Sequence, residues 1–244
     1  MFKHYSGRAV GLFLVIFIPL ILIFTLIAPM PQDQNYHLFV DERVLWHIPN
    51  FFNVISNIGF LITGVYGLVL YFRNHSFDYN PWLAFPLAVL LVFPGSCYYH
   101  WHPNDATLFW DRLPITMAFT SLICGIFQEV FNFQKSRTFL FVLHLLGLYT
   151  LVHWVLFNDL RFYAWLQLTS ILTMLYLSLV YKAKSVNLKF LLIATMLYIL
   201  AKVFEHNDEL VHQALNISGH SLKHLIASVA IFLLFLMKQQ GEQK

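Results

Sequence analysis

The sequence has little charge and almost no cysteine. Only 11% of its 244 residues are Asp, Glu, Lys or Arg, whereas soluble domains carry roughly 25%. A soluble globular domain is therefore excluded. The formal net charge of +3 is small and the Lys and Arg are scattered, so nothing indicates a nucleic-acid partner. Cys97 and Cys124 both lie within apolar stretches, which argues against a disulfide framework and a cysteine-ligated zinc site.

Long apolar runs follow one another from end to end, and 59% of the residues are hydrophobic. A membrane-spanning helix needs roughly 20 predominantly apolar residues. Runs broken by charge, Pro or Asn predict helices at about 9–28, 51–72, 82–101, 112–131, 138–157, 162–181, 188–205 and 219–237. The sequence therefore predicts an all-α, polytopic membrane bundle. The first run offers no good cleavage site near Ala28 and Pro29, so we expect a retained anchor helix.

The flanks of the runs indicate an orientation, because Lys and Arg accumulate on the cytoplasmic side of membrane proteins. With the N-terminus inside, the inner side carries Lys3, Arg8, Arg73, Lys135, Arg137, Lys182, Lys184, Lys189, Lys238 and Lys244. The outer side or the outer helix ends carry only Arg43, Arg112, Arg161, Lys202 and Lys223. We therefore expect both termini in the cytoplasm and the loop from Pro29 to Asn50 outside.

Twelve histidines are unusual in so apolar a chain. His220 and His224 are four residues apart, so a helix presents both imidazoles on one face, about one turn apart. His100 is expected at a similar depth, near the outer end of the third predicted helix. Ionisable groups inside a membrane are costly and usually mark function. The three histidines are therefore candidate metal ligands.

Two further side chains are expected near this depth. Ser96 precedes His100 by four residues, and Asp111 is expected to begin the fourth predicted helix on the outer side. Three neutral imidazoles leave zinc an open fourth position for water, which is the catalytic arrangement. Ordinary alternatives remain: the histidines as polar packing, Asp111 as a helix cap or partner of Arg112, and Ser96 bonded to a helix carbonyl.

These motifs resemble a known signature. Ser96-x-x-x-His100, Asp111 and His220-x-x-x-His224 are similar to the pattern of the superfamily that joins alkaline ceramidases and adiponectin/progestin receptors. The bacterial alkaline-ceramidase-like branch is more similar still, through the segments IPNFFNVISN at 48–57, WDRLP at 110–114, DLR at 159–161 and SGHSLKH at 218–224. The resemblance runs from about Tyr36 to the end.

The resemblance implies a fold, a location and an activity. Residues 1–35 would be an N-terminal membrane anchor helix and the start of the outer loop, and residues 36–244 a seven-transmembrane ceramidase-like domain. His100, His220 and His224 would bind zinc, while Ser96 and Asp111 would assist catalysis. The protein would be a zinc-dependent hydrolase of the bacterial inner membrane, acting near the outer leaflet on the amide of ceramide or a related N-acyl lipid. No protein partner is indicated.

Several other polar groups have competing interpretations. His102 is an alternative to His100, but two residues further along a helix it would point away from Ser96. Glu205 and His206 are candidates to orient the histidines. The stripe of Asn50, Asn53, Ser56 and Asn57 is explained by interhelical hydrogen bonds. Related eukaryotic ceramidases carry an acidic calcium site before this helix, but Asp33, Asp41 and Glu42 do not match its spacing convincingly, so calcium is not indicated.

Two other functions compete with hydrolysis. The receptor branch shares the zinc constellation, so ligand binding with little turnover is an alternative, although the short termini include no cytoplasmic signalling domain. Glu209-x-x-His212 resembles half of a di-iron carboxylate site. The second half of such a site is missing, and the sequence has no adjacent pair of histidines, so a di-iron lipid oxidase is the weaker alternative.

Overall fold

The computed structural model describes residues 2–183 and 186–242, and in these ranges the chain forms helices and no strand. The elements are α1 (Phe2–Leu26), η1 (Gln34–His37), α2 (Phe51–Ile55), α3 (Ile58–Asn74), α4 (Pro81–Trp101), α5 (Asp105–Phe131), α6 (Ser136–Phe157), α7 (Arg161–Val180), α8 (Leu188–His206), α9 (Asp208–Leu215) and α10 (Gly219–Glu242). The all-α bundle predicted from the sequence is confirmed.

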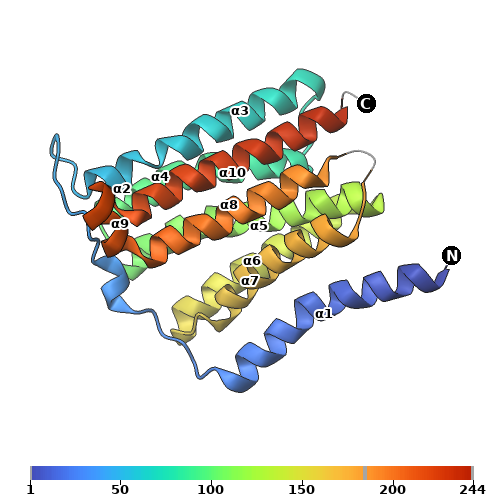
Figure 1. Ribbon diagram of the computed structural model, residues 1–244, viewed down its shortest axis with the longest axis horizontal. Helices are drawn as coiled ribbons and strands as arrows, with labels where there is room; N and C mark the ends of the chain where they lie inside the picture. The colour runs from blue at the N-terminus through green and yellow to red at the C-terminus, as the bar shows by residue number, and fades with distance from the viewer. Residues whose placement is uncertain (1, 184–185, 243–244) are drawn as a thin grey trace.

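Within the described ranges, seven segments are long and apolar enough to cross a membrane, which indicates a membrane protein. They are Gly7–Leu26, Phe51–Arg73, Pro81–Trp101, Asp105–Phe131, Ser136–Phe157, Arg161–Val180 and Gly219–Gln240. The remaining predicted span corresponds to α8. This helix has 19 residues, of which Lys189, Lys202 and Glu205 are charged, and it is not among these seven segments. It nevertheless lies in the bundle alongside α10 (Figure 1).

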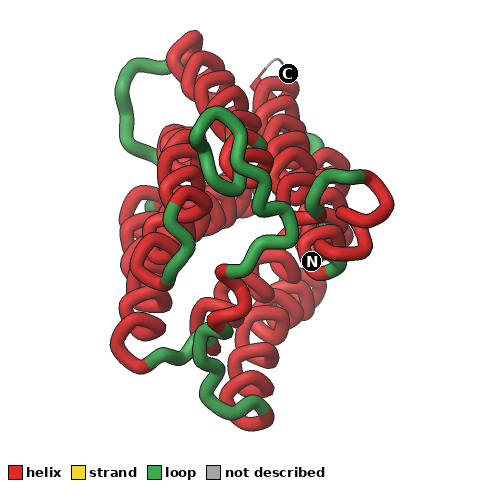
Figure 2. Tube along the Cα trace, turned by 90° about the vertical axis from the view of Figure 1, so that its left-hand side faces the viewer, coloured by secondary structure: helices red, strands yellow, loops and turns green. Residues whose placement is uncertain are grey.

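The long helices pack around a common interior. Six helices form a closed ring in the order α3, α4, α5, α7, α8 and α10, in which each contacts the next and α10 contacts α3. Helix α6 packs outside this ring against α5 and α7. Both chain ends lie at one end of the bundle, and α2, α9 and the long connection from α1 lie at the other (Figure 1). Figure 2 shows the bundle from the end that contains α2 and α9, and the long connection after α1 crosses this end. We call this end of the bundle the loop end.

The N-terminal helix α1 packs on the outside of the bundle against α7. Ile23 of α1 shares a small core with Trp165 and Leu166, and the Trp165 indole donates a hydrogen bond to the carbonyl of Ile16 at 3.0 Å. Helices in a membrane associate through such packing and interhelical hydrogen bonds. These contacts hold α1 at the periphery of the bundle.

Three boundaries differ from the prediction. The fourth predicted helix begins at Asp105 rather than near 112, because Asn104 and Thr107 form a capping box there. Asp111 therefore lies inside α5, and the alternative that it caps the helix is wrong. The predicted helix at 51–72 is divided into α2 and α3. Asp208–Leu215, which lies between the last two predicted helices, forms the short helix α9.

Candidate metal centre

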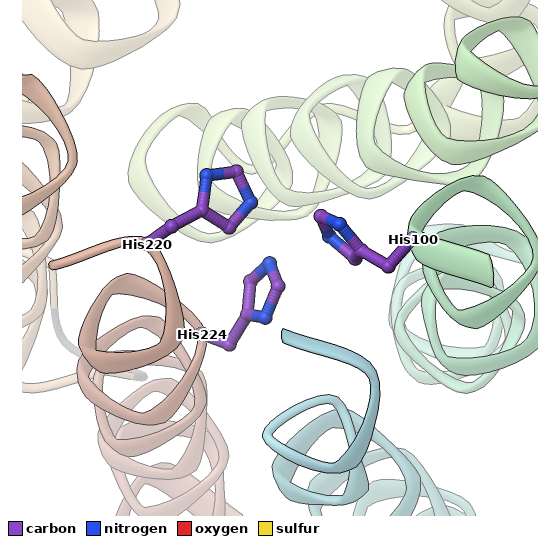
Figure 3. A group of neighbouring side chains, drawn as sticks. All are labelled: His100, His220 and His224. Carbon is purple, nitrogen blue, oxygen red and sulfur yellow. The ribbon is translucent and has the colours of Figure 1, made fainter. Parts of the chain in front are cut away.

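The three predicted histidines meet inside the bundle near the loop end. One ring nitrogen from each of His100, His220 and His224 lies within 4.8 Å of the others, a grouping that can hold a metal ion. The imidazoles point toward one another from α4 and α10 (Figure 3). Their exposed fractions are only 1%, 5% and 3%, so the cluster is shielded from solvent.

The start of α10 fixes the position of His220. The Asp208 carboxylate accepts a hydrogen bond from the His220 backbone N–H at 3.1 Å, which pairs one of the donors that a helix N-terminus leaves open. A side chain at Gly219 would collide with the carbonyl oxygen of Phe204. Glycine is therefore required where α10 begins against the end of α8.

Ser56 determines which nitrogen of His224 faces the cluster. The Ser56 hydroxyl donates to the carbonyl of Asn53 at 3.1 Å and lies 2.8 Å from Nδ1 of His224. Because a hydroxyl has a single hydrogen, Nδ1 of His224 is the donor in the second bond. This tautomer leaves Nε2 with a free lone pair, as metal ligation requires.

His100 has no hydrogen-bond partner for either ring nitrogen among the described residues. Both atoms are buried, although a buried polar group normally has a partner. The Phe39 and His220 rings lie against this imidazole, with centroids at 4.9 and 4.8 Å. An unpaired imidazole facing two others fits a ligand set completed by a cation.

Charged side chains lie close to both ring nitrogens of His220. Nε2 of His220 lies 3.0 Å from the Lys223 ammonium, which can only donate, so this nitrogen accepts. Lys223 and Lys202 each approach the Glu205 carboxylate to 2.7 Å, and Glu205 also lies 3.7 Å from Nδ1 of His220. Glu205 therefore links both lysines to one of the histidines.

Ser96 and Asp111 line the same cavity as His224. Both are buried, with exposed fractions of 1% and 8%. Oδ1 of Asp111 has no hydrogen-bond partner among the described residues. Gly95 allows this approach of α4 and α5, because a side chain there would meet the carbonyl oxygen of Trp110.

A cavity of about 340 Å³ opens next to these residues. Its polar end contains Ser96, Asp111, Arg112, His224, Lys202, Glu205 and Lys223. From there it extends between α4, α5, α8 and α10, and its apolar wall includes Phe85, Val89, Val92, Phe119, Leu122, Ala194, Ala227, Ala230, Ile231 and Leu234. Along each helix the wall residues are spaced about three or four positions apart, so they lie on the single helix face that lines the cavity.

Other candidates from the sequence lie elsewhere. His102 caps the end of α4 and is exposed, so it does not replace His100 in the cluster. His206 is also exposed, which leaves Glu205 as the group near His220. Asp33 accepts from the backbone N–H of Asn35 and caps η1. Within the described ranges, His100, His220 and His224 form the one grouping suited to a metal.

Two acidic residues at the loop end have structural partners. Asp41 is buried, which raises the pKa of its carboxyl group, but the hydrogen bonds from Arg43 outweigh this effect and hold that pKa below its usual value. Glu209 of the half-motif for di-iron accepts a hydrogen bond from Gln213 on the outside of α9. Neither acid faces the histidine cluster.

Sequence reasoning did not recognise the roles of Ser56 and Arg112. Ser56 was assigned to general interhelical bonding, yet it contacts a histidine of the cluster directly. Its position in the bend between α2 and α3 gives no signal of this contact, which depends on how α10 packs. Arg112 was considered only as a partner of Asp111, but it lines the cavity itself.

Comparison with known proteins adds no family assignment: no family model matches the chain, and no curated protein matches it.

Proposed function

We propose that this protein is a zinc-dependent integral membrane hydrolase that cleaves the amide bond of ceramide or a related N-acyl lipid, as its resemblance to the alkaline-ceramidase-like branch implies. The observation that carries the proposal is that the cluster of three buried histidines adjoins an apolar cavity, which His224 lines together with Ser96 and Asp111. A metal ligand set therefore lies next to two assisting side chains and to room for a hydrocarbon chain.

The donor set fits zinc. Three neutral imidazoles with an open fourth position are a common catalytic zinc set, whereas calcium and magnesium prefer oxygen ligands. His224 has the required tautomer, and both nitrogens of His100 are unpaired. The Lys223 ammonium, which contacts Nε2 of His220, also pairs with the Glu205 carboxylate at 2.7 Å. It therefore keeps a partner when the lone pair of His220 binds a cation.

Amide hydrolysis needs an activated water, a stabilised carbonyl oxygen and a proton for the leaving nitrogen. Zinc, when bound, lowers the pKa of water and acts as a Lewis acid toward the carbonyl oxygen. Ser96 donates its hydrogen bond to the carbonyl oxygen as negative charge develops there. Asp111 accepts a proton from water and delivers it to the nitrogen as the C–N bond breaks, so one water is consumed.

The cavity supports a lipid rather than a water-soluble substrate. Its wall below Ser96 and Asp111 is formed by Phe, Leu, Val, Ile and Ala side chains, and burying a hydrocarbon chain against them is favourable at about 0.8 kcal/mol per CH₂ group. An acyl chain lying along this wall brings its carbonyl carbon to the polar end. This placement puts the scissile amide beside Ser96, Asp111 and His224.

The test is turnover by the purified protein in nanodiscs. Ceramides, phytoceramides, N-acyl amino lipids and phospholipids are offered together, and products are followed by mass spectrometry while bound metal is measured. We expect one zinc per chain and release of fatty acid and free amine, abolished by a chelator and restored by zinc.

The variants His220→Ala and His224→Ala provide the matched controls for this assay. Each should lose both zinc and turnover, because affinity depends on the complete ligand set. Full zinc occupancy in either variant would reject the ligand assignment. Absence of turnover across the whole panel, with a lipid copurifying, would favour the ligand-binding alternative.

A further inference from the structure

Arg112 is buried at the polar end of the cavity with part of its guanidinium unpaired. It follows Asp111 on α5 and is only 7% exposed. Its Nη2 donates to the side-chain carbonyl of Gln32 at 2.8 Å, whereas its buried Nη1 has no hydrogen-bond partner among the described residues. An unpaired donor of this kind is costly unless something accepts from it.

Aromatic rings hold the guanidinium in place without completing its hydrogen bonds. Its central carbon lies 4.4 Å from the Trp154 ring centroid, 4.9 Å from that of Tyr163 and 5.7 Å from that of Tyr36. Cation–π contacts favour the charge. They act through the ring faces, so the in-plane N–H groups of Nη1 still need an acceptor.

Arg112 also lacks an acidic partner in the described part of the chain. Arg43 and Arg161, which lie at the same end of the bundle, form ion pairs with Asp41 and Asp159 at 2.6 and 2.7 Å. The two lysines that line the cavity share Glu205. Arg112 forms no ion pair within these ranges.

The side chains that line the cavity have an excess of positive charge. Arg112, Lys202 and Lys223 face two carboxylates, Glu205 and Asp111. An uncompensated charge next to an apolar wall is unfavourable, and an anion from a ligand would balance it. Arginine is well suited to that role, because its planar fork binds carboxylate or phosphate through two parallel hydrogen bonds.

We propose that Arg112 binds an anionic group, a carboxylate or a phosphate, on the amine part of the N-acyl lipid. The inference rests on the proposed function for the acyl chain and the amide, and it narrows the substrate to acidic N-acyl lipids. The acyl chain lies along the apolar wall, the amide lies beside Asp111, and the acidic group reaches Nη1 of the neighbouring Arg112.

The test compares two ligands that differ in this group alone. N-palmitoylglycine and N-palmitoylethanolamine share the acyl chain and the amide, but the first ends in a carboxylate and the second in a hydroxymethyl group. Their dissociation constants are measured in nanodiscs by competition with a neutral fluorescent acyl probe. We expect the wild type to bind the acid at least about tenfold more tightly, as for a gained charged hydrogen bond.

Arg112→Gln should bind both ligands equally, with its affinity for the ethanolamide unchanged. Arg43→Gln is the matched control, since this arginine lies at the same end outside the cavity, and it should keep the preference. Should Arg112→Gln fail to fold, Arg112→Lys retains a charge between the rings and should reduce the preference without abolishing it. A preference that persists in folded Arg112→Gln or Arg112→Lys at the wild-type level overturns the proposal.

Inorganic phosphate separates a lipid-borne anion from a free one. At millimolar concentration it should leave the binding of N-palmitoylglycine unchanged, and displacement by phosphate alone would overturn the assignment to a lipid. The measurement needs no turnover. An intact preference without hydrolysis would reject the hydrolase and support the Arg112 site, whereas equal binding of both ligands by the wild type would reject the site even if both were hydrolysed.

Discussion

At the scale of single residues, the chemistry available to each imidazole depends on the group that holds its other nitrogen. Ser56 accepts from Nδ1 of His224 and so directs Nε2 into the cluster. The same serine is held by Asn53, whose side-chain oxygen also accepts from Ser218 and Ser221 at 2.8 Å. The hydrogen bonds of Asn53 and Ser56 therefore connect α2 to the start of α10, where two of the three candidate metal ligands lie.

Replacing Ser56 with alanine should weaken metal binding. The variant removes the acceptor that fixes the His224 tautomer, and the loss of such an outer partner costs roughly 10–100-fold in metal affinity. The measurement is a zinc titration against a chromophoric chelator. Ser170→Ala is the control, because among the described residues this buried serine bonds to the carbonyl of Leu166 on its own helix and to no histidine of the cluster. Equal zinc affinities in the two variants would contradict the role given to Ser56.

Ser96→Ala and Asp111→Asn should lower turnover while leaving zinc bound. A lost oxyanion donor or proton-transfer group reduces the rate on the order of 100-fold, and neither side chain belongs to the histidine grouping. Single-turnover rates and metal content are measured on the same preparations. Near-normal rates would make these residues structural, and loss of zinc would place them among the ligands.

At the scale of helices and their connections, Asp159 joins three segments at the loop end. Its carboxylate accepts from the backbone N–H of Met30 and from the Arg161 side chain, and Arg161 also donates to the carbonyl of Ile27. Burial raises the pKa of Asp159, but the hydrogen bonds from Arg161 and Met30 outweigh it and lower the pKa to about 2. The ionised form therefore stabilises the junction of α1 with α7.

Acid should weaken this junction over a defined range. A carboxyl group whose pKa is lower in the folded state stabilises fully above its ordinary value of 3.8, and the contribution is lost as pH falls toward about 2. Asp159→Asn should therefore lower the thermal midpoint in detergent at pH 7, and its difference from wild type should shrink between pH 4 and pH 2. A difference that is constant over this range would reject the ionised role.

At the scale of the whole molecule, the histidine cluster belongs to the end of α4 and the start of α10. In Figure 1 the start of α10 lies at the opposite end of the bundle from the two chain ends. The distribution of Lys and Arg predicts cytoplasmic termini and an outer loop from Pro29 to Asn50; two of the counted residues, Lys184 and Lys244, lie outside the described ranges. With this orientation the candidate metal centre would lie toward the outer leaflet.

Cysteine labelling tests this orientation. After Cys97 and Cys124 are replaced, single cysteines are introduced at Gln34 and Gln240, which are exposed at opposite ends of the bundle. An impermeant maleimide added to intact cells should label position 34 only, and position 240 should react after permeabilisation. The reverse pattern would place the metal centre on the cytoplasmic side.

The sequence alone was sufficient to predict the helical membrane bundle and the three histidines of the candidate site. Apolar runs of membrane length are local features, and the spacing of His220 and His224 places them on one helix face whatever surrounds them. The start of α5 was predicted too late, because the capping box at Asn104 lies before the apolar run rather than within it.

The tertiary structure alone decided what surrounds the histidines. Ser56 reaches the site from the bend between α2 and α3, Glu205 from α8 and Arg112 from α5. Their side-chain partners depend on packing between segments far apart in the sequence. No spacing rule relates Ser56 to His224 or Arg112 to Gln32. The unpaired Nη1 of Arg112 can be recognised only when every neighbour that could accept its hydrogen bond has been placed. A local sequence pattern shows that a charged residue is present but not whether it has a partner.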